Sequence, residues 1–387
     1  MTTRSKKRVP ELQADLIELI RGIDDYYELA AIQDSITQAL SGVPTDSAVP
    51  DVFVLLSQDL RDAAATMGPK EARYLMDLYY QCQEIRKRAR EQVRSMEKEP
   101  EPHKILQFVY SVFSRLEARI HLAMDLYSDS RLVGRWSKLN YGIGPVLAGG
   151  LMAHLEIEKA PTVGHIWRFC GLDPTVEWLG TDRGEALVRE LVAAGGWSTR
   201  EVTEDELFCV AAEVNRKAGN LRKLAVDEES GIITPQSLAA AVARRPYSHR
   251  CHVLCWKLGE SFKNFSSHPE CFYGELYIQR RDQERVWNEQ LRFKDQADRK
   301  LYGDAKHKPT QIGRNTEAYK WYSQGKLPPS RIILRSERWA VKIFLAHWHY
   351  IEYLDHFGKE PPKPYVLTLP GHSRPLPIPH WPMPKPL

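Results

Sequence analysis

Near the middle of the chain lies the stretch Leu139-Asn140-Tyr141-Gly142-Ile143-Gly144-Pro145-Val146-Leu147-Ala148-Gly149-Gly150. Its Gly-x-Gly turn leads into an apolar helix that continues to His154. Gly142 and Gly144 let the backbone approach a phosphate closely, and free N–H groups at a helix start can point at that phosphate. No strand pattern precedes the turn, so the stretch favours a helix-hairpin-helix unit over a dinucleotide site, with residues 157–172 as the second helix. The alternative is a tight turn whose glycines are only structural.

Helical patterns stand on both sides of this turn, so we expect an all-α chain. Residues 69–130 predict an antiparallel coiled-coil hairpin, because apolar residues recur at heptad spacing on both sides of Glu99-Pro100-Glu101-Pro102. On the first arm these residues are Leu75, Cys82, Ala89 and Met96, and on the second they include Ile105, Val112, Leu116 and Ile120.

These sequence patterns divide the chain into four regions. We expect a helical N-terminal region at 1–66, the coiled-coil hairpin at 67–132, a helical nucleic-acid-binding domain at 133–358 and a Pro-rich tail at 359–387. The domain carries an insertion at about 180–232, where Thr203 opens a helix as a capping box and Thr234-Pro235 starts the next helix. The tail has ten prolines between 361 and 387 and is expected to be an extended strap or to lack regular structure.

The net charge of +4 over 387 residues hides an asymmetry. Between Arg244 and Tyr350 there are 21 Lys and Arg against 11 Asp and Glu, so this segment carries +10 and the remainder −6. A basic half points to a polyanionic partner, and the alternative is a set of solvated helix faces. No apolar run is long enough to span a membrane and Met1–Pro10 lacks a signal core, so we expect a cytoplasmic protein with reduced cysteines.

Three helices make up the basic half. The first follows Pro246 and buries Cys251, Leu254, Cys255, Leu258 and Phe262; the others are expected at 273–300 and 330–357. Arginines on one helical face can follow a phosphate backbone, and Tyr247, Trp287 and Trp321 offer stacking surfaces, although an aromatic residue taken singly is more often part of the core. The candidate nucleic-acid contacts are Gly142, Gly144, Arg168, Arg244, Arg245, Tyr247, Arg250, Lys257, Arg281, Arg285, Arg331, Arg335 and Arg338.

The signs of catalysis are weak. Ser237 and Ser248 lie near arginines that could stabilise a phosphoryl transition state, but nothing nearby in the sequence supplies a base. A zinc site at Cys251, His252, Cys255, His268 and Cys271 would lack the usual tight Cys-x2-Cys turn, so we expect no metal and no cofactor. No carboxylate set for a metal-dependent nuclease begins the chain.

The segment from Tyr141 through Phe169-Cys170-Gly171-Leu172 resembles the C-terminal domain of bridge-RNA-guided insertion-sequence transposases. The run from Arg245 to Trp256 and the helix through Arg338 match the order of elements in that domain, so similarity covers about 136–170 and 236–355. A coiled coil followed by such a domain also resembles the Nop domain of box C/D ribonucleoproteins and of the Tas proteins of tandem-interspaced-guide-RNA systems.

The resemblance implies a guide-RNA-binding protein that lacks a nuclease domain and targets DNA by base pairing. Its partners would be a structured guide RNA and a target DNA, and a homodimer through the coiled coil is expected. Two alternatives stay open. One is a serine-dependent transposase or recombinase using Ser237 or Ser248, and the other is a helical adaptor protein.

Overall fold

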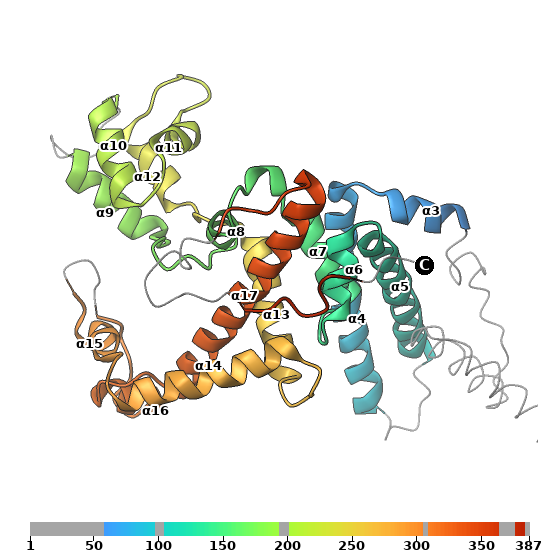
Figure 1. The fold of residues 1–387 in the computed structure, drawn as a ribbon. Helices are drawn as coiled ribbons and strands as arrows, with labels where there is room; N and C mark the ends of the chain where they lie inside the picture. Colours follow the sequence, from blue (N-terminus) through green and yellow to red (C-terminus); the bar gives the residue numbers. More distant parts are fainter. Residues whose placement is uncertain (1–57, 97–103, 193–200, 305–308, 364–375, 384–387) are drawn as a thin grey trace, which may run out of the picture. The chain divides into compact units, whose positions relative to one another are not determined.

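The computed structural model describes residues 58–96, 104–192, 201–304, 309–363 and 376–383, and within these ranges all regular structure is helical. The all-α prediction is therefore confirmed. The chain divides into two compact units. The helices are labelled in Figure 1. The described residues of the first are 58–62, 77–96 and 104–123, and those of the second begin with 63–76 and resume at 124.

The first unit consists mainly of two long helices, α4 (Pro69–Met96, whose first residues belong to the second unit) and α5 (Lys104–Asp129). The rings of Tyr79 and His121 lie 6.2 Å apart, and Arg86 donates to Glu117 at 2.5 Å. As the residue numbers of the contacts increase along α4, from Tyr79 to Arg86, those along α5 decrease, from His121 to Glu117. The two helices therefore run antiparallel. The Pro-rich turn predicted at 99–102 lies outside the described residues, and supercoiling of the pair stays a prediction.

The second unit is built around α17 (Pro329–Phe357), which packs against α6, α8, α13 and α14. Phe344 of α17 stacks on Trp136 with ring centroids 5.5 Å apart, and Phe262 and Tyr273 close the cluster. The predicted apolar stripe of the helix after Pro246 is fully buried, which confirms that pattern. The helices around α17 are α6 (Leu132–Leu139), α7 (Pro145–His154), η2 (Ile157–Lys159), α8 (Val163–Phe169), α13 (His249–Asn264) and α14 (Phe272–Glu289).

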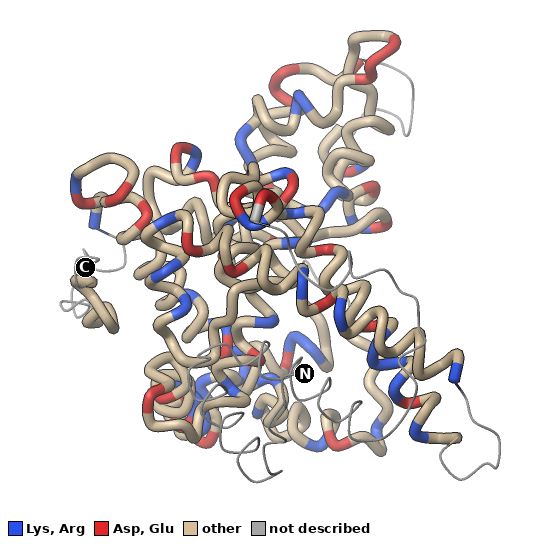
Figure 2. Tube along the Cα trace, turned by 90° about the vertical axis from the view of Figure 1, so that its right-hand side faces the viewer, with Lys and Arg blue, Asp and Glu red and all other residues tan. Residues whose placement is uncertain are grey.

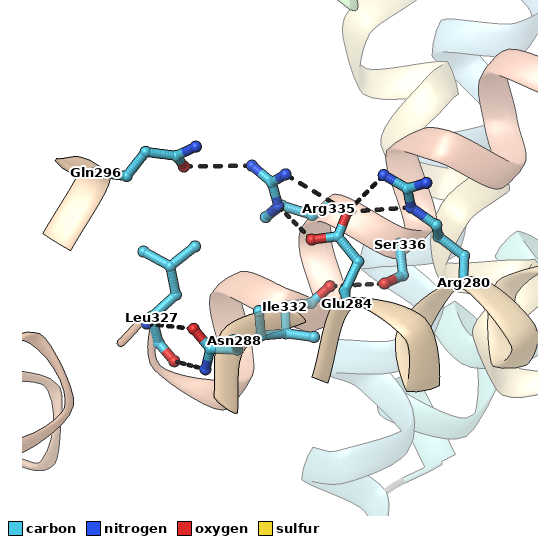
Figure 3. Close-up of polar contacts among 8 residues, drawn as sticks. All are labelled: Arg280, Glu284, Asn288, Gln296, Leu327, Ile332, Arg335 and Ser336. Atoms are coloured by element: carbon cyan, nitrogen blue, oxygen red, sulfur yellow. Dashed lines mark hydrogen bonds and ion pairs between the residues drawn. The ribbon is translucent and has the colours of Figure 1, made fainter. Parts of the chain in front are cut away.

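The single helix expected at 273–300 is wrong, because α14 ends at Glu289 and α15 begins at Lys294 and ends at Tyr302. Leu291 adopts a left-handed φ of 58°, and the Arg292 N–H donates to the carbonyl of Trp287, as in a Schellman helix end. Tertiary contacts hold this break: the Asn288 amide bonds both the N–H and the carbonyl of Leu327 (Figure 3). A small core of Phe293, Ala297, Tyr322, Leu327 and Ile332 forms beyond it, with α16 (Glu317–Ser323).

The described residues between 180 and 243 (180–192 and 201–243) form a subdomain of four helices with its own core, which includes Val188, Leu207, Leu221 and Leu238. The capping box at Thr203 and the Thr234-Pro235 helix start are both present, as predicted. The core also takes in the helix after Thr234, which lies beyond the insertion expected at 180–232. The four helices are α9 (Gly180–Val192), α10 (Glu204–Glu213), α11 (Ala218–Ala225) and α12 (Pro235–Ala243).

A described part of the Pro-rich tail, residues 376–383, returns to the second unit. The indole of Trp136 donates to the carbonyl of Pro379 at 2.8 Å, so this segment behaves as a strap over α6. Of the helices that the structure describes, α3 (Gln58–Thr66) included, none combines the length and apolar character that crossing a bilayer requires.

Candidate nucleic-acid interface

The two glycines of the central turn differ in their surroundings. Gly142 has φ +90°, accepts a hydrogen bond from Ser261 Oγ, and leaves only 3.0 Å between a Cβ and that oxygen. Gly144 is exposed, caps α7 and has open space around it. Pro145 has no N–H, and the N–H groups of Leu147 and Ala148 already bond the Gly144 carbonyl. The turn therefore offers an open backbone at Gly144 but few free donors for a phosphate.

Positive charge gathers on the face of α17 that carries Arg331, Arg338 and Lys342. Arg331 and Arg338 are exposed, and neither forms an ion pair with a residue in the described ranges. Desolvation and then the charge of Arg331 lower the pKa of the Arg338 guanidinium. Desolvation also lowers the pKa of Lys342, which sits over the Trp167 ring. An anion bound here would relieve the repulsion between these cations.

Arg335 lies on the same helix but serves another partner. Its Nε donates to Glu284 Oε2 at 2.6 Å, while Arg280 holds Oε1 of the same carboxylate at 2.7 Å (Figure 3). Arg335 also donates to Gln296 and lies over the Phe293 ring. This candidate contact is therefore already engaged in holding α14 to α17.

The arginines expected on the 273–300 helix are partly neutralised. Arg281 and Arg285 share the carboxylate of Asp282, at 2.9 and 3.3 Å. Trp287 is flanked by the guanidinium groups of Arg280 and Arg292, whose carbons lie 4.8 and 5.3 Å from the ring centroid. The Trp287 ring is half-buried and already packed against these two arginines, and Trp321 is half-buried as well.

Three further candidates lie where the α9–α12 subdomain joins the rest of the second unit. Arg168 donates to the carbonyl of Asn215, and Arg245 lies 4.7 Å above the Trp178 ring. The carbonyl of Arg244 accepts from Arg216 at 2.8 Å, while the Arg244 side chain is exposed. These arginines belong to a junction between subdomains and not to the face of α17.

The remaining aromatic and charged candidates lie on α13 or just before it, and a recess lies between this helix and α17. Tyr247 packs against His252 with ring centroids 4.9 Å apart, and His252 Nδ1 lies 3.0 Å from the Cys170 carbonyl oxygen. Arg250 is exposed and Lys257 half-buried on the same helix. The recess is lined by Leu172, His252, Cys255, Trp256, Gly259, Leu334, Glu337 and Arg338.

Sequence reasoning missed Trp256 and Glu337 at this recess. Trp256 is 53% exposed, and its position off the buried stripe of α13 was the available signal. Glu337 had no such signal, because a charged residue in a long helix is normally solvated and only the packing shows that it is 3% exposed.

The serine candidates both cap helices. Ser237 Oγ accepts from the Thr234 N–H at 3.0 Å while Thr234 caps Ser237 in return, and Ser248 Oγ accepts from the Cys251 N–H. Neither hydroxyl bonds a histidine or carboxylate of the described residues.

The cysteine and histidine candidates for zinc are dispersed. Cys251 and Cys255 are buried, and His268 stacks on the ring of Tyr141 at 3.7 Å. Cys271 donates to the Tyr141 carbonyl. Across the described ranges, no three His, Cys, Asp or Glu side chains form a group that could hold a metal ion.

The sequence matches no protein-family model, and neither the curated proteins nor the solved structures contain a significant match to it.

Proposed function

We propose that this protein binds a structured guide RNA, without a nuclease domain of its own, and that the RNA selects a target DNA by base pairing. The observation that carries the proposal is the pair of exposed arginines on α17, Arg331 and Arg338, beside the recess that Trp256 lines. Guanidinium groups suit phosphate oxygens, and aromatic rings suit unpaired bases. Pairing would supply sequence specificity, so the protein needs mainly backbone contacts.

The resemblance to Nop-type and bridge-RNA transposase domains supports the same proposal. It concerns the order of elements in the sequence, in which two long helices come before a basic helical domain. The proposal includes a homodimer through α4 and α5. Light scattering on the purified chain tests that part, and a monomer mass at all concentrations would remove it.

The first experiment purifies the full chain from its native host and sequences the RNA that stays bound. One enriched small RNA with a constant structured part and a variable part is the expected result. A background of fragmented ribosomal and transfer RNA alone would contradict a dedicated guide.

The second experiment tests the face of α17 with a labelled single-stranded RNA, by fluorescence anisotropy from 50 to 400 mM salt. The double substitution Arg331→Ala/Arg338→Ala should weaken binding and reduce the slope of log K against log salt by about 1.4, since each phosphate contact to a single strand contributes about 0.7. The matched control is Arg222→Ala/Lys223→Ala on α11, which removes the same charge from the α9–α12 subdomain. Equal losses in both variants would show that net charge alone, and not this face, governs binding.

A further inference from the structure

We propose that Arg338 and Lys342 of α17 together bind a terminal phosphate of the RNA, that is, the phosphate monoester at one end of its chain. This inference rests on the proposed function and deepens it, because it names the chemical group of the RNA that this surface holds. It starts from two positive charges one helical turn apart, neither of which forms an ion pair with a residue in the described ranges.

Arg338 and Lys342 project from the same face of α17. Four residues of α-helix rise about 6 Å along the axis and turn by about 40°, so the two side chains are neighbours. Like charges at this spacing repel each other and destabilise a helix. The protein leaves this repulsion in place, and an anion held between the two side chains would offset it.

Trp167 holds the Lys342 side chain in position. The Lys342 ammonium lies 5.0 Å from the centre of the Trp167 ring, and the indole N–H donates to the Lys342 carbonyl at 3.2 Å. The face of an aromatic ring attracts a cation but carries no net charge. Lys342 therefore keeps its positive charge for a ligand while its side chain is fixed on one side.

Two carboxylates act on this pair of cations, and both are engaged elsewhere. Asp173 accepts hydrogen bonds from the N–H and the hydroxyl of Thr175, at 2.9 and 2.7 Å. Glu337, the neighbour of Arg338, pairs with Lys263 at 3.2 Å. Burial lowers the pKa of Lys342, Asp173 opposes that shift and Arg338 adds to it. The result is a pair of cations whose positive charge is not balanced by the protein around it.

A phosphate monoester suits these two cations better than a phosphodiester inside the chain. Above its second pKa of about 6, a monoester carries about two negative charges and three strong acceptor oxygens. An internal phosphodiester has a single charge and two such oxygens. The planar guanidinium of Arg338 can donate to two oxygens of a monoester, which leaves the third for the Lys342 ammonium.

Arg331 lies on the same face but outside the pair. It precedes Arg338 by seven residues, which places it about 10 Å away along the axis and within about 20° around it. At that distance it can meet a phosphodiester of the same RNA while the pair holds the end. Arg331 therefore contributes to affinity for any RNA, and the pair decides the preference for a terminal phosphate.

The test measures fluorescence anisotropy of the full chain with an internally labelled uridine 12-mer. The oligomer carries a phosphate at its 5′ end, at its 3′ end or at neither end. We expect one of the two phosphorylated oligomers to bind about tenfold more tightly than the one with hydroxyls at both ends, as for a charge-assisted contact. Arg338→Gln and Lys342→Met each remove one charge of the pair and should reduce this preference to less than about twofold.

Arg331→Gln is the matched control, because it removes one positive charge from the same face and leaves the pair intact. It should weaken all three oligomers by the same factor, so the preference for the terminal phosphate stays near its wild-type value. A loss of preference as large as in Arg338→Gln would overturn the assignment to the pair and would leave only the total charge of the face.

Free uridine monophosphate tests whether the rest of the RNA matters. It carries the same monoester, and it should displace the labelled oligomer only at a concentration about a hundredfold higher than the unlabelled phosphorylated 12-mer, because it lacks the phosphodiesters that meet Arg331. Equal potency of the two competitors would overturn the assignment to an RNA end in favour of a site for free nucleotides.

The remaining outcomes separate this inference from the proposed function. Salt-dependent binding of all three oligomers with equal affinity overturns the terminal-phosphate site and leaves the proposed function standing. A preference that persists in both Arg338→Gln and Lys342→Met, with each variant folded by circular dichroism, also overturns the site. Failure of the wild-type chain to bind any RNA in a salt-dependent way overturns both.

Discussion

At the scale of single residues, Glu284 links two helices of the basic half, α14 and α17. The carboxylate is 1% exposed and lies between Arg280 of its own helix and Arg335 of α17 (Figure 3). Arg280 in turn lies over the rings of Trp287 and Trp339. A buried charge without its partners is costly, so this group of three depends on every member.

Glu284→Gln should therefore destabilise the protein by about 2–3 kcal/mol. Loss of a fully buried pair typically costs about 3–5 kcal/mol, and the lower figure allows for the 24% and 35% exposure of the two arginine side chains. Urea unfolding followed by circular dichroism measures the change. Glu275→Gln, an exposed position on the same helix, is the control, and equal effects would show that Glu284 has no special role.

A second residue-scale prediction concerns His347, whose Nδ1 lies 2.8 Å from the Tyr273 hydroxyl in the core. Burial lowers the pKa of His347 from 6.5 to about 4, so the folded state favours the neutral ring. Because the folded pKa lies below the ordinary one, its contribution to stability is complete above pH 6.5 and is lost as pH falls toward 4. This loss amounts to about 3 kcal/mol at most.

Thermal melts between pH 7 and pH 4.5 measure this contribution. His347→Gln should lower the melting temperature at pH 7 and make it fall less steeply with acid than in the wild type. The exposed His249→Gln should keep the wild-type slope. If the melting temperatures of His347→Gln and the wild type fall equally as the pH is lowered, protonation of His347 is not the cause of the loss of stability in acid.

At the scale of elements, the start of α12 decides the role of Ser237. Thr234 and Ser237 each bond the other's backbone N–H, a reciprocal cap at the helix N-terminus. Ser237→Ala and Thr234→Ala should each cost about 1 kcal/mol of stability, and the double variant should cost less than their sum. RNA binding should be unchanged in both. The control for stability is Gln236→Ala at an exposed position of the same helix.

A separate outcome would bring back the recombinase alternative. This outcome is a covalent protein–DNA adduct that forms in the wild type and disappears only in Ser237→Ala.

At the scale of the whole molecule, the α9–α12 subdomain stands apart from the basic half in composition. Residues 180–243 contain 7 Lys and Arg against 11 Asp and Glu, a net charge of −4. Acidic residues mark this part of the trace in Figure 2. Its entry and exit lie together, because Trp178 Nε1 donates to the Ala243 carbonyl at 2.8 Å.

Replacing residues 180–243 with a short Gly-Ser linker should therefore leave the remaining chain folded. RNA affinity should stay within about threefold of the full chain, with the same salt slope, because the removed segment carries no net positive charge. Anisotropy and circular dichroism on both proteins make the comparison. A tenfold loss of affinity in a folded excision variant would mean that Arg168, Arg244 and Arg245 act in binding through their contacts at this junction.

The local patterns were enough to predict much of the fold. Spacing of apolar residues predicted the all-helical class and the buried stripe of α13, although it missed the break between α14 and α15, and the caps at Thr203 and Thr234 were visible as short motifs. These features depend on residues within a few positions of one another, where helix geometry alone decides which side chains share a face. Charge counting likewise located the basic half.

The tertiary structure decided which of those basic side chains form ion pairs and which stay exposed. Arg331, Arg335 and Arg338 share a helix face, yet Arg335 is taken by Glu284 from a helix 51 residues earlier, while the other two stay exposed. The break at Leu291 depends on the distant backbone of Leu327, and the recess at Trp256 exists only because α17 brings Glu337 and Arg338 against α13. The sequence by itself determined that the chain is helical and basic in its second half. Pairing of a charge and formation of a recess need partners far apart in the chain, so only packing could settle them.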